Sequence, residues 1–133
     1  MASDTLQPLN TLAPMPKGPE TDPDDPARKD YIEGRKFFKE GEYTQAAMAF
    51  HNALRGFEEK GDQIGMANAA DRLGDACLAR GEYAMALANY QQALAICEKE
   101  DDSFSLLALN KKMAAAYRKL NDNDKALEVL YDI

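Results

Sequence analysis

The chain has 133 residues, a formal net charge of −7 and a pI of about 4.7. This length allows one domain, and a composition that is 45% hydrophobic and 29% charged is that of a globular protein. The acidity argues against a nucleic-acid partner, and no apolar run is long enough to span a membrane.

The first 24 residues differ in composition from the rest of the chain. Five of the six prolines lie in this stretch, among scattered acidic residues, and no periodic apolar face is present. Such a composition is typical of a disordered acidic tail. The stretch lacks the positive start and the long apolar segment of a secretory signal, so we expect a cytoplasmic location. The folded domain is therefore predicted over residues 25–133.

Apolar and small residues three and four apart predict six helices after this tail. Asp25 and Pro26 open the first helix, because an Asp side chain accepts backbone N–H groups and Pro suits the first helical position. Gly61 and Asp62, and later the run 101–103, end one helix and cap the next. The predicted helices span about 27–40, 43–60, 63–80, 83–100, 103–120 and 123–133.

The residue pattern of the central helices recurs 40 positions away on both sides. Such a fixed interval is typical of an array of helical hairpins. Gly41, Gly81 and Asn121 fall at the predicted turns, where a left-handed backbone is needed. Small residues let the paired helices approach closely, and bulky ones fill the space between them. The other matched sets are Gly34, Gly74 and Ala114; Phe37, Cys77 and Tyr117; Tyr43, Tyr83 and Asn123; Ala46, Ala86 and Ala126; Phe50, Tyr90 and Leu130; and Ala53, Ala93 and Ile133.

These repeated residues resemble the signature of the tetratricopeptide repeat. The 40-residue interval exceeds the roughly 34 residues usual in that family, so the chain resembles the long-repeat variant found in scaffold proteins. It departs from the signature in the third copy, where Asn123 takes the place of the turn aromatic residue. In the second copy the resemblance is carried by Leu73-Gly74, Gly81-Glu82-Tyr83, Ala86, Tyr90 and Ala93-Leu94.

The resemblance implies an all-α fold, a right-handed α-α superhelix of three helical hairpins over about 27–61, 62–101 and 102–133. It also implies a non-enzymatic module for protein–protein interaction, an adaptor or a scaffold. In this family the first helix of each hairpin lines a concave groove. A ligand is therefore expected on those three helices.

No catalytic or metal-binding pattern accompanies the repeats. His51 is the one histidine, and it has no Cys, Asp or Glu at the spacing of a helical metal site. Cys77 and Cys97 fall too far apart along their hairpin to be bridged, which indicates two buried thiols in a reducing compartment. The glycines lie at hairpin positions and form no phosphate-binding loop. We therefore predict a chain that is not an enzyme and that uses no cofactor or metal.

The charge distribution indicates what the implied groove binds. The first helices of the three hairpins carry net charges of +2, 0 and +4 in a chain of −7. A basic groove favours an acidic or amphipathic peptide segment of a partner protein. A solvated helix face without a ligand stays open as the simpler interpretation. The groove residues implied by the resemblance are Arg28, Tyr31, Arg35, Phe38, Lys39, Asn68, Asp71, Arg72, Asp75, Leu78, Lys111, Lys112, Ala115, Arg118 and Lys119.

Two details of this groove set shape the expected ligand. Asp71 and Asp75 repel an acidic peptide unless Arg72 or a base of the ligand pairs with them. Tyr31 and Arg35 stand where some relatives have the Lys and Asn that grip the end of a chaperone, so binding of chaperone tails is not implied.

Other functions stay open beside the adaptor. The third hairpin has no closing helix with a polar outer face, which favours self-association or a structural segment of a longer protein. A small specialised secretion chaperone shares three such repeats. The acidic tail could also occupy the groove of its own molecule. Neither a nucleic acid nor a membrane is an expected partner.

Overall fold

The structure is a computed structural model that describes residues 25–131, so the predicted tail and the last two residues lie outside the described range. Every predicted helix is confirmed, and each helix end in that range lies within one residue of its predicted position. The six helices of this range are α2 (Pro26–Lys39), α3 (Tyr43–Lys60), α4 (Gln63–Ala79), α5 (Tyr83–Lys99), α6 (Ser103–Lys119) and α7 (Asn123–Tyr131).

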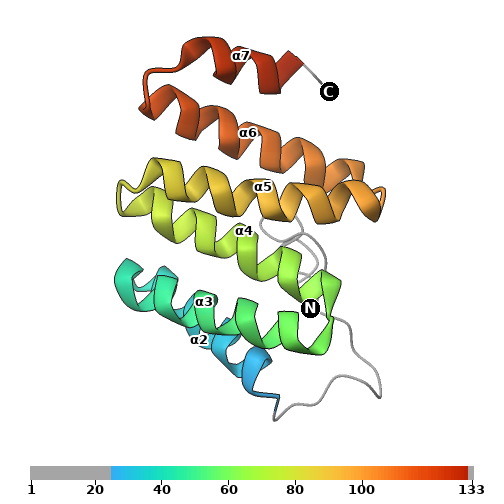
Figure 1. Ribbon diagram of the computed structural model, residues 1–133. Coiled ribbons are helices and arrows are strands. Elements are labelled where there is room, and N and C mark those ends of the chain that lie inside the picture. Colours follow the sequence, from blue (N-terminus) through green and yellow to red (C-terminus); the bar gives the residue numbers. More distant parts are fainter. Residues whose placement is uncertain (1–24, 132–133) are drawn as a thin grey trace, which may run out of the picture.

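The helices are stacked in chain order, from α2 to α7 (Figure 1). Each helix packs against its neighbours in the sequence, and α2 also contacts α4. The pairs α2–α3, α4–α5 and α6–α7 are the three predicted hairpins. We call α2, α4 and α6 the A helices, and α3, α5 and α7 the B helices.

A left-handed residue lies in every turn between helices, at a regular interval of 20 residues. The prediction is confirmed for Gly41, Gly81 and Asn121, whose φ angles are 81°, 82° and 63°. Gly61 and Asp101 adopt the same backbone at the turns between hairpins, with φ angles of 71° and 58°. Asp tolerates this conformation because its short polar side chain can bond locally. The 40-residue repeat of the sequence therefore contains two turns in the structure, placed 20 residues apart.

Aspartate side chains begin the A helices, as predicted. Asp25 and Asp62 each accept a hydrogen bond from a backbone N–H of the first turn, at 3.1 and 2.9 Å. Asp102 accepts two bonds from Ser105, from its backbone N–H at 3.1 Å and from its hydroxyl at 2.7 Å. The B helices α3 and α5 begin without a side-chain cap bond. The B helix α7 does have such a cap, because Asp122 accepts a hydrogen bond from the Lys125 N–H at 3.1 Å, so only α3 and α5 begin without one.

Inside the first two hairpins, a glycine of the A helix faces an aromatic ring of the B helix. A Cβ added at Gly34 lies 2.6 Å from Phe50 Cδ1, and one added at Gly74 lies 2.5 Å from Tyr90 Cε1. Both rings are fully buried. The third hairpin has an alanine and a leucine in the same register, so a larger residue on the A helix goes with a smaller one on the B helix. The glycines are therefore required by close packing.

The repeated alanines lie at the contacts between helices. Ala46, Ala86 and Ala126 are all buried, and so are Ala53 and Ala93. A continuous hydrophobic core that includes four of these five extends from α2 to α6. This confirms the predicted role of the small residues and fixes the register of the hairpins.

Candidate functional site

The predicted groove residues all belong to the A helices, and the structure exposes them to different degrees. Three of them, Tyr31, Asn68 and Asp71, are no more than 3% exposed. The ring of Tyr31 packs against Phe50, with centroids 5.8 Å apart, so it belongs to the core of the first hairpin. The exposed members are Arg35, Lys39, Lys111, Arg118 and Lys119, and the partly buried ones are Arg28, Phe38, Arg72, Asp75, Leu78, Lys112 and Ala115.

A polar cluster of buried and partly buried side chains joins the second and third hairpins. Lys112 of α6 reaches back to α4, where its Nζ lies 2.8 Å from Asp71 Oδ1 and 3.1 Å from Asp75 Oδ2. Tyr90 of α5 donates a hydrogen bond from its hydroxyl to Asp75 Oδ1 at 2.6 Å. Lys112 Nζ also lies 5.8 Å from the centre of the Tyr90 ring. We call these four residues the lysine cluster, and they connect three helices.

Two carboxylates share one ammonium group in the lysine cluster, and this arrangement shifts the pKa values of Asp71, Lys112 and Tyr90. Burial raises the pKa of Asp71 to about 6; Lys112 opposes this shift and the charge of Asp75 adds to it. Burial lowers the pKa of Lys112, but the charges of Asp71 and Asp75 outweigh burial and the net shift is upward. Burial and the nearby Asp75 raise the pKa of Tyr90, so its hydroxyl keeps the proton that it donates.

The lysine cluster supplies a partner for Asp71 and Asp75 that the sequence did not indicate. Sequence reasoning expected these acids to repel an acidic peptide unless Arg72 or a base of the ligand paired with them, whereas the structure pairs both with Lys112. The ammonium group of Lys112 therefore contributes to contact between hairpins and is not a free charge of the groove. Sequence reasoning also missed the tyrosine hydroxyl of the cluster. The sequence did contain a signal for this hydroxyl. Tyr90 stands where the first copy has Phe50, so the second copy differs there by one added hydroxyl group.

The exposed basic residues of the groove set form no ion pair with any residue in the described range. Arg35 and Lys39 are exposed on α2, and Lys111 and Arg118 are exposed on α6. Between these two helices lies α4, whose two acids, Asp71 and Asp75, are already paired with Lys112. The A helices therefore present unpaired positive charge at both ends of the stack.

Arg72 is a different kind of unpaired group. Its Nε and Nη2 atoms are buried and have no hydrogen-bond partner among residues 25–131. The residue as a whole is partly exposed. A buried charged donor without an acceptor is costly, since it has lost water and gained nothing in return. An acceptor supplied from outside the described chain would be stabilised at this position.

A separate cavity of about 360 Å³ lies between the start of α4 and the end of α5. Ile64, Ala67 and Ile96 line it together with Cys97 and the acidic residues 100–102. Burial and the neighbouring acids raise the pKa of Cys97 to about 12, so its thiol stays protonated and is a poor nucleophile. Both cysteines are free and buried, as the sequence predicted.

No group of three His, Cys, Asp or Glu side chains within residues 25–131 could hold a metal ion. His51 is exposed on α3. In the part of the chain that the structure describes, no helix combines the length and the apolar character needed to cross a membrane.

Comparison with known proteins agrees with this architecture. The tetratricopeptide repeat family matches the chain over residues 34–99 and 65–132. The chain therefore belongs to the tetratricopeptide repeat family, whose fold is an all-α superhelix of helical hairpins that serves in general as a protein–protein interaction module. Among solved structures, the TPR domain of Arabidopsis FLU aligns with a TM-score of 0.72 and 26% identity, over 80% of this chain and 92% of that one. No curated protein matches the chain.

Proposed function

We propose that the chain is an adaptor or scaffold module that binds an acidic or amphipathic peptide segment of a partner protein along its A helices. One observation carries this proposal. The exposed basic residues of the groove set on α2 and α6 (Arg35, Lys39, Lys111, Arg118 and Lys119) have no acidic partner among the described residues, while Asp71 and Asp75 of α4 are paired with Lys112. A peptide that brings carboxylates to this face therefore meets positive charge at both ends of the stack.

The spacing of residues on α6 supports this ligand class. Lys111 and Arg118 are seven positions apart, which is about two helical turns, so they project on the same side of the helix. Ala115 lies between them and leaves room for a peptide backbone. An arginine can hold a carboxylate with two parallel hydrogen bonds, and a lysine acts as a point charge. Phe38 and Leu78 are partly buried on the other A helices and offer apolar contact.

The proposal also includes the variant of the repeat, the cellular compartment and the role of the tail. The regular 20-residue spacing of the turns supports a place in the long-repeat variant of the family. The two unbridged thiols support a reducing compartment such as the cytoplasm. We also retain the predicted boundary at residue 25, with an acidic tail that competes with the partner peptide for the groove.

Fluorescence anisotropy with two synthetic peptides tests the proposal. One peptide alternates Glu with Leu, and in the other every Glu is replaced by Gln, so that only the charge differs. We expect the full chain to bind the Glu peptide more tightly and to lose this preference as salt is raised, because exposed charges are screened. Equal affinities at low salt for both peptides would show that the basic residues are only a solvated helix face.

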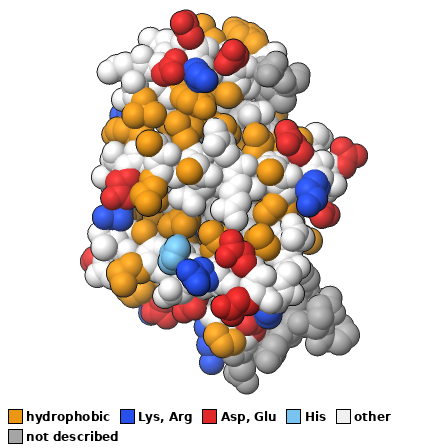
Figure 2. Space-filling view, in the orientation of Figure 1, with side chains coloured by type: hydrophobic (Ala, Val, Ile, Leu, Met, Phe, Trp, Pro, Cys, Tyr) orange, Lys and Arg blue, Asp and Glu red, His pale blue; other side chains and the backbone are white. Residues whose placement is uncertain are grey.

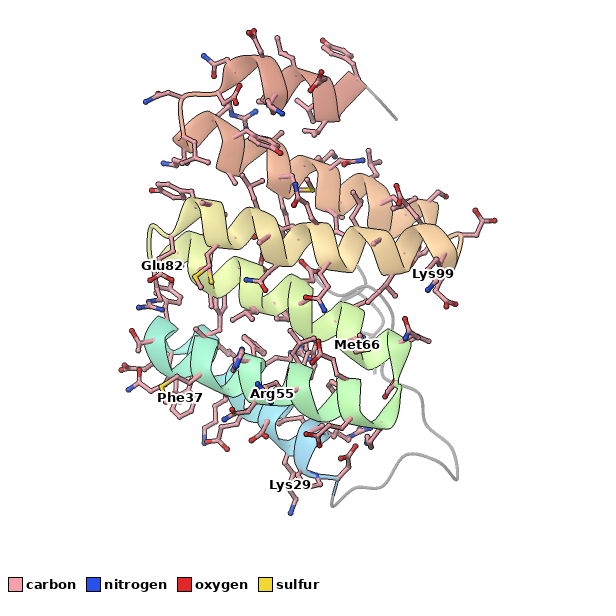
Figure 3. The ribbon with its side chains drawn as sticks, in the orientation of Figure 1. Lys29, Phe37, Arg55, Met66, Glu82 and Lys99 are labelled. Atoms are coloured by element: carbon pink, nitrogen blue, oxygen red, sulfur yellow. The ribbon has the colours of Figure 1, made fainter. Side chains whose placement is uncertain are left out.

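Charge reversal locates the binding surface. Lys111→Glu and Arg118→Glu, made separately, are expected to weaken binding of the Glu peptide. Lys99→Glu is the matched control, because Lys99 is a basic residue of a B helix and does not belong to the groove set. It is the last residue of α5, at the opposite end of that helix from Glu82 (Figure 3). Deletion of residues 1–24 is expected to strengthen binding if the acidic tail competes. A loss of affinity in the control as large as in the two α6 variants would place the ligand elsewhere.

Self-association is a second candidate function, and exposed apolar residues favour it. In repeat register Leu127 corresponds to Leu87, which is 8% exposed, yet Leu127 is 51% exposed. Phe104 and Leu107 of α6 are exposed as well. On the face shown in Figure 2, hydrophobic side chains gather over the upper part of the stack, where Figure 1 places α5 to α7. Light scattering that gives a dimer mass for the full chain and a monomer mass for Leu127→Glu would support this candidate.

A further inference from the structure

The outward side of the B helices α3 and α5 lacks charged residues over most of its length. Residues 43–54 of α3 and 83–97 of α5 contain no Asp, Glu, Lys or Arg, although 29% of the chain is charged. Burial does not account for this composition, because Met48 is 63% exposed and Met85 is 58% exposed. The exposed positions of the A helix α2, by contrast, are mostly charged. We call the exposed residues of these two stretches the neutral face.

Charged residues border the neutral face. Gln92 Nε2 of α5 donates a hydrogen bond to Glu58 Oε2 of α3 at 3.4 Å, so the two B helices adjoin. Charged residues appear on α3 only from Arg55 onward, and on α5 only at Glu98 and Lys99. In Figure 2 uncharged side chains fill the middle of the face shown, over α5, and charged ones lie mainly at its margins. A centre that is depleted of charge, contains exposed methionine and has a polar rim is typical of a protein–protein interface.

The spacing of exposed residues on α5 indicates which partner covers the neutral face. Ala84, Ala88, Gln91 and Ala95 are exposed along one side of the helix, at intervals of four, three and four residues. These intervals are the same in both directions. Two antiparallel copies of α5 therefore bring Ala84 opposite Ala95 of the second copy, and Ala88 opposite its Gln91. No like charges meet in this contact, whereas a contact between the A helices of two copies would bring basic residues together.

We propose that the neutral face is the contact surface of a homodimer, in which two copies pack with their α5 helices antiparallel across a twofold axis that passes between Ala88 and Gln91. This surface is separate from the exposed apolar end of the stack at Leu127, and the proposal does not depend on peptide binding. The A helices of both copies stay free. Such a dimer offers two binding surfaces, and a partner with two suitable segments gains affinity by engaging both.

The size of the neutral face sets the expected strength of the dimer. It extends about 22 Å along α5 and about 20 Å across the two B helices, which gives roughly 400 to 500 Å² for each copy. The total of about 900 Å² is at the low end for specific interfaces. We therefore expect a reversible dimer with a dissociation constant of roughly 1 to 100 μM.

Sedimentation velocity of the full chain over a range of concentrations tests the dimer. The wild type is expected to move from the monomer to the dimer mass across this range, and Ala88→Glu is expected to stay a monomer because it places two like charges near the axis. Ala79→Glu is the matched control, since it makes the same change at an exposed alanine of the A helix α4. It should dimerise like the wild type, as should Leu127→Glu. Circular dichroism checks that Ala88→Glu is folded.

Three outcomes would overturn the proposal. They are a wild type that stays monomeric up to about 1 mM, a folded Ala88→Glu that still dimerises, and a control that loses the dimer as completely as Ala88→Glu. A dimer that is lost in Leu127→Glu and kept in Ala88→Glu would place the contact at the end of the stack. The affinity of Ala88→Glu for the Glu peptide separates this proposal from the proposed function, because failure of one leaves the other measurement unchanged.

Disulfide cross-linking tests the antiparallel register. Ala84→Cys and Ala95→Cys are made in separate chains, mixed and oxidised, and a covalent dimer that contains one copy of each variant is expected. Either variant alone should cross-link much less, because its two introduced thiols lie about 16 Å apart along the paired helices. The native Cys77 and Cys97 are buried and so do not compete. Cross-linking of one variant with itself as efficiently as in the mixture would show that the register is wrong.

Discussion

The glycine–aromatic contact inside the first hairpin makes a quantitative prediction about stability. In the variant Gly34→Ala, the new Cβ would lie 2.6 Å from two carbons of the Phe50 ring, well inside the 3.4 Å at which ordinary contact begins. Alanine stabilises a helix interior by about 1 kcal/mol relative to glycine, whereas overpacking of a core costs about 1 to 3 kcal/mol. Phe50 is fully buried, so its ring has little room to move. We therefore expect a cost in the upper part of this range, about 2 to 3 kcal/mol, and after the gain of about 1 kcal/mol from alanine a net loss of about 1 to 2 kcal/mol in the free energy of unfolding.

A double-mutant cycle separates the overlap from the effect of alanine on the helix. The second variant is Phe50→Leu, and the double variant reproduces the Ala114 and Leu130 pair of the third hairpin. The two changes are expected to couple favourably by about 1 to 2 kcal/mol. Urea denaturation followed by circular dichroism measures the free energy of unfolding of the wild type and of each variant. Thermal unfolding is a second measurement, in which a loss of about 1 kcal/mol should lower the midpoint by about 4 to 8 °C. A neutral or stabilising Gly34→Ala, with additive free energies, would refute the close contact.

Three further predictions concern stability in other parts of the stack. Ala86→Leu is expected to lower the free energy of unfolding by about 1 to 3 kcal/mol, because a larger side chain at this fully buried position separates packed helices; an unchanged thermal midpoint would contradict the hairpin register. The pKa of Asp71 is raised from 3.8 to about 6 on folding, so its carboxyl binds more protons in the folded state and its contribution to stability falls as pH rises through this window. The stability of the wild type relative to Asp71→Asn is therefore expected to decrease by up to about 3 kcal/mol between about pH 4 and pH 6.5, and an increase would show that Lys112 lowers the pKa instead. Amide hydrogen exchange is expected to be faster in α7 than in the first twelve residues of α5, because the described part of α7 spans only 9 residues and packs mainly against α6, whereas α5 packs against both α4 and α6; slower exchange in α7 would count against this.

The fold could be predicted closely because its signals are local or periodic. Gly41 and Gly81 mark turns, Asp62 caps a helix, and a shared interval places each hairpin in the same register. Asp101 at a left-handed position is a weaker signal, since aspartate is also common in caps and loops. The helix ends depend on these short-range features, so the sequence allowed few other positions for them.

The site was harder to predict because it depends on contacts between hairpins. Lys112 lies 41 positions from Asp71, and the periodicity of either helix alone does not show that they meet. The burial of a groove residue depends on contacts between helices as well, including those within one hairpin. Tyr31 occupies a groove position by resemblance, but its ring turns into the core against Phe50.

The even spacing of the left-handed residues has a practical consequence for protein engineering. Successive helices run in opposite directions, so the turns between them lie at two opposite edges of the stack (Figure 1). A Cβ added at Gly41 or Gly61 meets no atom within 4 Å, so these turns are bordered by open space. Peptide tags, labels or whole domains inserted at these positions would extend outward from an edge, since exposed loop tips tolerate insertion. The A helices would remain accessible, which makes these turns suitable attachment points for reporters that follow ligand binding.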